Sequence, residues 1–166
     1  MKKNIIIFVT ILVAIIGLLL WGRAGNPSLN ASATLTGVTQ SNLTENVPGY
    51  NFGSVSILRG NVERAFALKN NTDTDIQITS AETSCMCTRA ILQLPDGKEI
   101  GPFGMAGHGF SPSLDALVRP GEIITVRAIF DPAAHGPSGV GRIERAGNLM
   151  TNKGPVMMQF EATVTP

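Results

Sequence analysis

The sequence predicts an all-β domain: an immunoglobulin-like antiparallel β-sandwich of about seven strands, preceded by one N-terminal transmembrane helix. Three observations favour this architecture. From Tyr50 onward, short stretches in which apolar and polar residues alternate are separated by turn residues. The 166 residues include 18 glycines and 10 prolines, a turn-rich composition. A single continuous apolar run lies close to the N-terminus.

The apolar run occupies residues 5–21, which read IIIFVTILVAIIGLLLW, and Lys2 and Lys3 precede it. As a helix this run reaches about 25 Å, which is the short limit for spanning a bilayer. Because positive charge stays on the cytoplasmic side, we expect residues 1–24 to be a signal anchor that places the rest of the chain outside the cytoplasm. The alternative is a signal peptide that is cleaved, in which case the body of the protein is secreted.

The remainder of the chain divides into a linker and one domain. Residues 25–48 are rich in Ser, Thr, Asn and Gly, a composition typical of a flexible linker. We expect residues 49–166 to form the sandwich. Charged residues make up only 15% of the chain and the formal net charge is +1. Since no basic surplus is available to neutralise phosphates, the composition argues against nucleic acid as a partner.

Seven stretches carry the strand signals, and turn residues separate them: residues 52–57, 62–68, 76–78, 88–94, 123–130, 139–149 and 156–164. Alternation places one set of side chains in the core: Phe66, Leu68, Ile76, Ile78, Val126, Phe130, Met158 and Phe160. The longest irregular stretch is predicted between Leu94 and Leu117. Within it, Pro95-Asp96-Gly97 predicts a turn, followed by a return strand through Glu99 and Ile100.

Five short motifs follow one another along the body: FGSV at 52–55, FALKNNT at 66–72, TSCMCT at 83–88, RPGE at 119–122 and TN at 151–152. Their order resembles the bacterial domain of unknown function 1573 family, whose pattern runs F-G-x-V, F-x-x-x-N-x-G, S-C-G-C-T, P-G-E and T-N. The resemblance covers roughly residues 50–165 and implies an exported, immunoglobulin-like sandwich of the ASH and major sperm protein type. It implies no enzymatic activity. Met86 departs from the family's usual glycine, and the loop with Met105 and His108 looks like an insertion.

The only two cysteines, Cys85 and Cys87, allow three interpretations. In an extended strand their Cα atoms lie about 6.5–7 Å apart, at or beyond the disulfide range, so a bridge requires a bend. Alternatively, thiolate, thioether and imidazole groups are ligands for copper or zinc, and the candidate metal ligands are then Cys85, Cys87, His108, Met105 and Met86. In the third interpretation the cysteines are free and pack as small hydrophobic residues.

The loop that contains Met105 and His108 is expected to fold back over the cysteine segment. A hairpin through residues 88–100 returns the chain to that position, and glycines in the loop let the backbone approach closely. His135, the other histidine, is expected in a solvated turn between Ala134 and Gly136.

The sequence contains none of the nucleotide-binding, hydrolase or zinc-protease motifs, so an enzyme is not predicted. We expect a binding or interaction module that contacts the membrane through residues 5–21 and an envelope protein through the sandwich. No small-molecule substrate is indicated. Two alternatives remain open: a thiol-redox or copper-delivery protein that cycles the Cys85-Met86-Cys87 motif, and a purely structural envelope domain.

Overall fold

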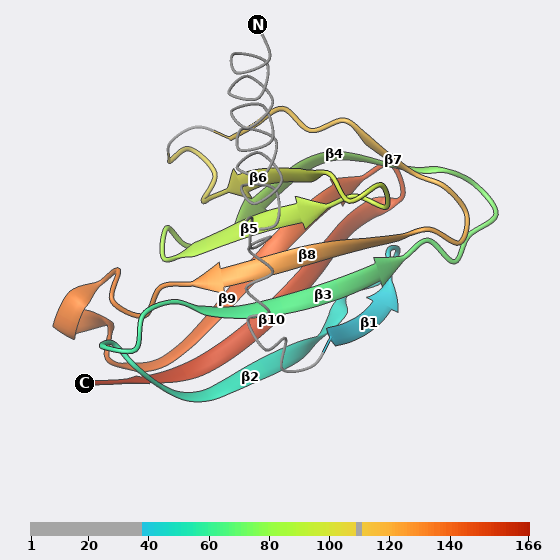
Figure 1. The fold of residues 1–166 in the computed structure, drawn as a ribbon. Coiled ribbons are helices and arrows are strands. Elements are labelled where there is room, and N and C mark those ends of the chain that lie inside the picture. Colours follow the sequence, from blue (N-terminus) through green and yellow to red (C-terminus); the bar gives the residue numbers. More distant parts are fainter. Residues whose placement is uncertain (1–37, 109–110) are drawn as a thin grey trace, which may run out of the picture. The chain divides into compact units, whose positions relative to one another are not determined.

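The computed structural model describes residues 38–108 and 111–166, which fold into two five-stranded sheets (Figure 1). The predicted membrane helix at 5–21 lies outside these residues. Within the described part of the chain, no helix is long and apolar enough to cross a membrane. The regular structure there consists of strands and one short 3-10 helix, η1 (Gly136–Gly139). The all-β prediction is therefore confirmed for the body of the protein.

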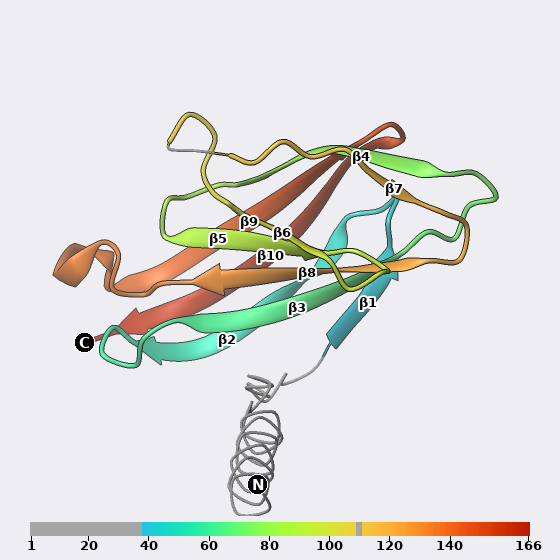
Figure 2. The ribbon, with the colours of Figure 1, turned by 45° about the horizontal axis from the view of Figure 1, so that its top comes forward.

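Each sheet collects strands from distant parts of the chain. In the first sheet the order is β1 (Val38–Asn42), β3 (Val62–Lys69), β8 (Ile123–Phe130), β5 (Thr88–Gln93) and β6 (Glu99–Phe103). In the second sheet the order is β2 (Val47–Ser56), β10 (Gly154–Thr165), β9 (Gly141–Thr151), β4 (Ile76–Thr83) and β7 (Ala116–Val118). Figure 2 shows the two sheets as layers. The rings of Phe130 on β8 and Phe160 on β10 pack between them with centroids 5.8 Å apart.

The strand count exceeds the prediction. All seven predicted strands are present, and β1, β6 and β7 bring the total among the described residues to ten. Strand β6 is the predicted return strand, and its turn is closed by a 2.8 Å hydrogen bond from the Leu94 N–H to the Lys98 carbonyl. Strand β7 lies in the stretch that was expected to be irregular. With only three residues, β7 is too short to show a period in the sequence.

Two strands of the described residues include positions before the predicted domain boundary at residue 49. Strand β1 lies inside the predicted linker at 25–48, and Leu43 directly after it is completely buried. Strand β2 starts at Val47, also before the predicted boundary at residue 49. The sequence of β1, VTQSN, is mostly polar. Its extended conformation depends on backbone pairing with β3, which no local pattern encodes.

The prediction that the sandwich is antiparallel is wrong in one pairing of each sheet. Strand β1 pairs in parallel with β3, and β2 pairs in parallel with β10. Both sheets are therefore mixed. Alternation of apolar residues identifies a strand but not its direction, because direction depends on how the chain crosses between the layers.

The predicted core is confirmed residue by residue. At most 2% of the surface is exposed for each of the eight predicted side chains: Phe66, Leu68, Ile76, Ile78, Val126, Phe130, Met158 and Phe160. Alternation fixed these positions because a slip of one residue would have turned every side chain to the opposite face.

Asn70 is completely buried and joins the end of β3 to two loops. Its Nδ2 atom donates to the carbonyl oxygens of Thr74 at 2.9 Å and Val118 at 2.8 Å. Its backbone N–H donates to the Glu122 carbonyl, and its own carbonyl accepts from the Gly121 N–H. The asparagine of the FALKNNT motif therefore fastens the Pro-Gly-Glu turn to β3.

Candidate functional site

The cysteines lie in a tight turn between β4 and β5. The Thr88 N–H donates to the Cys85 carbonyl at 3.0 Å, which closes a β-turn over residues 85–88. The Thr83 hydroxyl lies 3.1 Å from the Cys85 carbonyl oxygen and 2.9 Å from that of Thr88. The turn therefore supplies the bend that brings together two side chains which an extended strand would hold apart.

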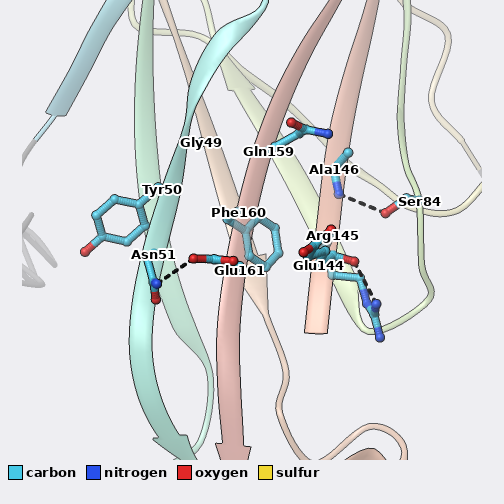
Figure 3. A pocket seen from close by; sticks show the side chains of 10 residues that line it. All are labelled: Gly49, Tyr50, Asn51, Ser84, Glu144, Arg145, Ala146, Gln159, Phe160 and Glu161. Atoms are coloured by element: carbon cyan, nitrogen blue, oxygen red, sulfur yellow. Dashed lines mark hydrogen bonds between the residues drawn. The ribbon is translucent and has the colours of Figure 1, made fainter. Parts of the chain in front are cut away.

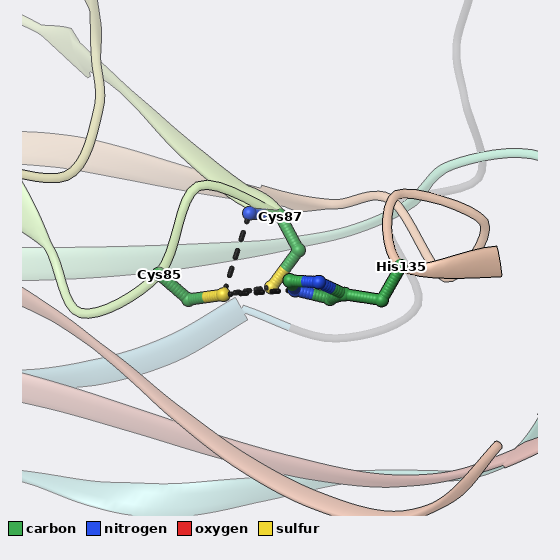
Figure 4. A group of neighbouring side chains, drawn as sticks. All are labelled: Cys85, Cys87 and His135. Carbon is green, nitrogen blue, oxygen red and sulfur yellow. Dashed lines mark hydrogen bonds between the residues drawn. The ribbon is translucent and has the colours of Figure 1, made fainter. Parts of the chain in front are cut away.

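The Sγ atoms of Cys85 and Cys87 lie 2.7 Å apart, and both cysteines are free (Figure 4). Cys87 is buried, with 2% of its surface exposed, whereas Cys85 is half-buried. The backbone N–H of Cys87 also points at the Cys85 sulfur, 3.5 Å away. Both sulfurs can consequently act on the same metal ion or on each other.

His135 completes this cluster. Its Nε2 atom lies 3.3 Å from the Cys85 Sγ atom, and its ring faces the sulfurs in Figure 4. The ligand atoms of Cys85, Cys87 and His135 all lie within 4.8 Å of one another. His135 is exposed and precedes helix η1, so its position at a solvated turn agrees with the prediction. Its contact with the thiols was not predicted.

Backbone contacts hold the His135 loop beside the cysteine turn. Strand β5 pairs with β8 so that Thr88 lies opposite Phe130. One residue further, the Asp131 N–H donates to the Cys87 carbonyl at 2.9 Å. This register could have revealed His135, because it places the residues that follow Phe130 next to those that precede Thr88. The sequence alone did not show that 88–94 and 123–130 are neighbours.

Arg145, on a strand of the second sheet, places a positive charge beside the two sulfurs. It lies on β9, and its Nε atom donates to the Cys87 Sγ atom at 3.2 Å. Its Nη1 atom donates to the Glu144 carbonyl at 2.8 Å, which holds the guanidinium in place. A fixed cation beside a sulfur stabilises the thiolate.

The surroundings shift the pKa values of the two thiols in opposite directions. Burial raises the pKa of Cys85, but hydrogen bonds from the thiol and backbone N–H of Cys87, the His135 ring and the charge of Arg145 lower it from 9.0 to about 7. The pKa of Cys87 is raised, first by burial and then by its hydrogen bond to Cys85, although the hydrogen bond from Arg145 opposes this. These shifts favour Cys85 as the thiolate of the pair, with Cys87 as its hydrogen-bond donor.

The other three predicted metal ligands, Met86, Met105 and His108, line a hollow together. Its lining comprises Met86, Arg89, Pro102, Phe103, Gly104, Met105 and His108. The loop does return to the cysteine segment, as expected, because the Thr83 N–H donates to the Gly104 carbonyl at 2.9 Å. His108, however, is not a member of the group formed by the two cysteines and His135. Of the predicted ligands, the group therefore contains Cys85 and Cys87, and it adds His135, which was not among them.

Arg145, which contacts the thiol pair, also lines a further hollow of about 450 Å³ (Figure 3). Its lining comprises Gly49, Tyr50, Asn51, Ser84, Glu144, Arg145, Ala146, Gln159, Phe160 and Glu161. Across it, Asn51 Nδ2 donates to Glu161 Oε1 at 2.6 Å, and the Ala146 N–H donates to the Ser84 hydroxyl at 2.9 Å. Two pairs of lining residues are therefore joined by hydrogen bonds.

No family model and no curated protein matches this chain. Among solved structures, it is similar to a protein of unknown function from Porphyromonas gingivalis W83, at 16% identity and a TM-score of 0.48, over 69% of this chain and 43% of that one. The CupB6 tip adhesin from Pseudomonas aeruginosa matches at 12% identity and a TM-score of 0.43, over 73% and 40%. The chain thus spans less than half the length of either structure, and similarities this weak assign no function.

Proposed function

We propose that this protein is an extracytoplasmic binding module that holds a soft metal ion, Cu(I) in the first place, through Cys85, Cys87 and His135. The observation that carries the proposal is the convergence of two sulfurs and one imidazole nitrogen within 4.8 Å of one another. Thiolates select Cu(I), and imidazole suits both copper and zinc. The preference for Cu(I) rests on the two soft sulfur ligands, since zinc would need water or another group as its fourth ligand.

Charge and acidity support the same assignment. Metal binding requires deprotonated thiols, and the pKa of Cys85 is already lowered to about 7. Two thiolates around Cu(I) leave one net negative charge, which the Arg145 guanidinium at 3.2 Å from Cys87 Sγ would offset. His135 is exposed, so an ion can reach the cluster from solvent.

The location of the module follows from the sequence. We propose that residues 5–21 anchor it in the cytoplasmic membrane, with the sandwich outside the cytoplasm. The two facing sheets with their shared core support an immunoglobulin-like sandwich, a fold that presents loops and strand edges to a protein partner. The partner would be another envelope protein.

A competition titration of the full chain in detergent tests the metal site. The reduced protein competes with a chromogenic Cu(I) chelator, and wild type should bind one equivalent. Cys85→Ser should abolish tight binding, and His135→Ala should weaken it by about tenfold or more. His108→Ala is the matched control, since His108 lies outside the cluster, and it should leave the affinity unchanged. Failure of wild type to compete, or equal weakening by both histidine variants, would contradict the proposal.

A further inference from the structure

We propose that Cys85 and Cys87 also act as a dithiol that exchanges with accessible disulfide bonds, with Cys85 as the attacking and Cys87 as the resolving residue. The disulfide of a small thiol is the substrate class. The reaction needs no bound metal, so it does not depend on the function proposed above. It is carried by the geometry of the two sulfurs and their neighbours.

The exposure of the two residues assigns the attacking role. Cys85 is half-buried and Cys87 has 2% of its surface exposed, so an incoming disulfide meets the Cys85 sulfur first. The Cys87 N–H lies 3.5 Å from that sulfur and His135 Nε2 lies 3.3 Å from it. The Cys87 N–H, and the His135 ring when Nε2 carries the proton, can donate to the Cys85 sulfur and so favour it as the attacking atom.

The distance between the sulfurs assigns the resolving role. At 2.7 Å, the Cys87 Sγ atom is already in contact with the Cys85 Sγ atom. The β-turn closed by Thr88 provides the bent backbone that such a bridge requires. Arg145 Nε, 3.2 Å from Cys87 Sγ, stabilises the thiolate that forms when Cys87 loses its proton. The mixed disulfide on Cys85 would therefore be resolved within the chain.

Two exchange steps complete the reaction. In the first, the Cys85 thiolate attacks one sulfur of the disulfide. A bond forms between them, the original S–S bond breaks and one thiolate leaves. In the second, Cys87 gives its proton to solvent and attacks the Cys85 sulfur, which releases the second thiolate. Two electrons pass from the cysteines to the substrate, which ends as two thiols, and the protein ends with a Cys85–Cys87 disulfide.

The test uses the reduced full chain in detergent, with chelators present to keep it free of metal, and oxidised glutathione as the probe. After acid quenching, wild-type protein should carry a Cys85–Cys87 bridge and no glutathione, with two glutathione thiols released per chain. Cys87→Ser should accumulate one glutathione on Cys85. Cys85→Ser should react at least about tenfold more slowly than wild type, because its remaining thiol is buried. His108→Ala is the control and should match wild type.

Three results would overturn the assignment: no reaction of wild type, a stable mixed disulfide on wild type, or equal trapping of glutathione by the two serine variants. Peptide mapping of the wild-type product locates the bridge without relying on the folding of any variant. A chain that binds Cu(I) but does not react with glutathione would refute only this inference. The converse result would refute only the metal site.

Discussion

The Nε2 atom of His135 lies 3.3 Å from the Sγ atom of Cys85, although 50 residues separate them in the chain. The contact exists because β5 and β8 are neighbours in one sheet and their adjoining loops meet at the same end. The hydrogen bond from the Asp131 N–H to the Cys87 carbonyl fixes the two loops together. Paired strands thus assemble a cluster whose members have no regular spacing in the sequence.

Alkylation of Cys85 should show a midpoint near pH 7, because the pKa of this thiol is lowered to about 7. A lowered pKa keeps the thiolate present at a lower pH, so the rate should rise with pH, reach half its maximum near 7 and fall about tenfold per unit well below that value. The measurement is the rate of iodoacetamide labelling of the metal-free reduced chain, with the label located by tandem mass spectrometry. A midpoint near 9 at Cys85 would disprove the prediction.

Replacement of Arg145 should raise the pKa of Cys85, because the positive charge of Arg145 lowers that pKa and its hydrogen bond to Cys87 holds the charge beside the sulfurs. Arg145→Met keeps the aliphatic stem but removes the charge, and alkylation of Cys85 at pH 7 should slow by about twofold or more. Arg142→Met is the matched control on the same strand, since Arg142 pairs with Glu144 and Glu161. Equal effects of the two variants would show that Arg145 acts only through overall charge.

Phe66→Ala should destabilise the domain by about 3–5 kcal/mol, the usual cost of emptying the site of a buried phenylalanine. The Phe66 side chain is completely buried in the core between the two sheets. The measurement is the free energy of unfolding from a urea titration. Leu58→Ala is the control, because 87% of Leu58 is exposed, and it should change the free energy by no more than about 0.5 kcal/mol.

Asn70→Ala should cost about 2 kcal/mol or more, because it removes the donor for two backbone carbonyls in a buried setting. The neighbouring Asn71 is exposed, and its side-chain amide donates to the Asn42 side chain. Asn71→Ala should therefore cost about 0.5 kcal/mol or less. Thermal melts of the two variants, measured side by side, provide the comparison. Similar melting temperatures would mean that Asn70 does not tie the two turns together.

A reporter fused after Pro166 tests the predicted topology. Lys2 and Lys3 precede the apolar run, so the C-terminal body should lie outside the cytoplasm. Alkaline phosphatase, which folds only outside the cytoplasm, should be active in this fusion. Replacing both lysines with glutamate should reduce that activity. If a cytoplasmic reporter at the same position were active and the phosphatase inactive, the predicted topology would be wrong.

The local alternation of apolar and polar residues was enough to predict most of the strands and the faces that they bury. Phe66 and Leu68, or Met158 and Phe160, stand two residues apart, and only one face of a pleated strand can carry both into the core. The same rule could not reveal β1 or β7, since neither is long and apolar enough to show a period. It also could not give strand direction, which depends on the path of the chain between the layers.

The candidate site, like the fold, could be predicted from the sequence only in part. The sequence by itself identified Cys85 and Cys87, because they are the only thiols of the chain and one residue separates them. It also predicted that the loop with Met105 would return to this segment, which the contact between Thr83 and Gly104 confirms. Only the tertiary structure decided that His135 and Arg145, rather than His108, face the sulfurs. His135 lies in the loop that follows β8, and Arg145 lies within β9. The distance between such side chains is set by strand pairing and by the packing of the two sheets.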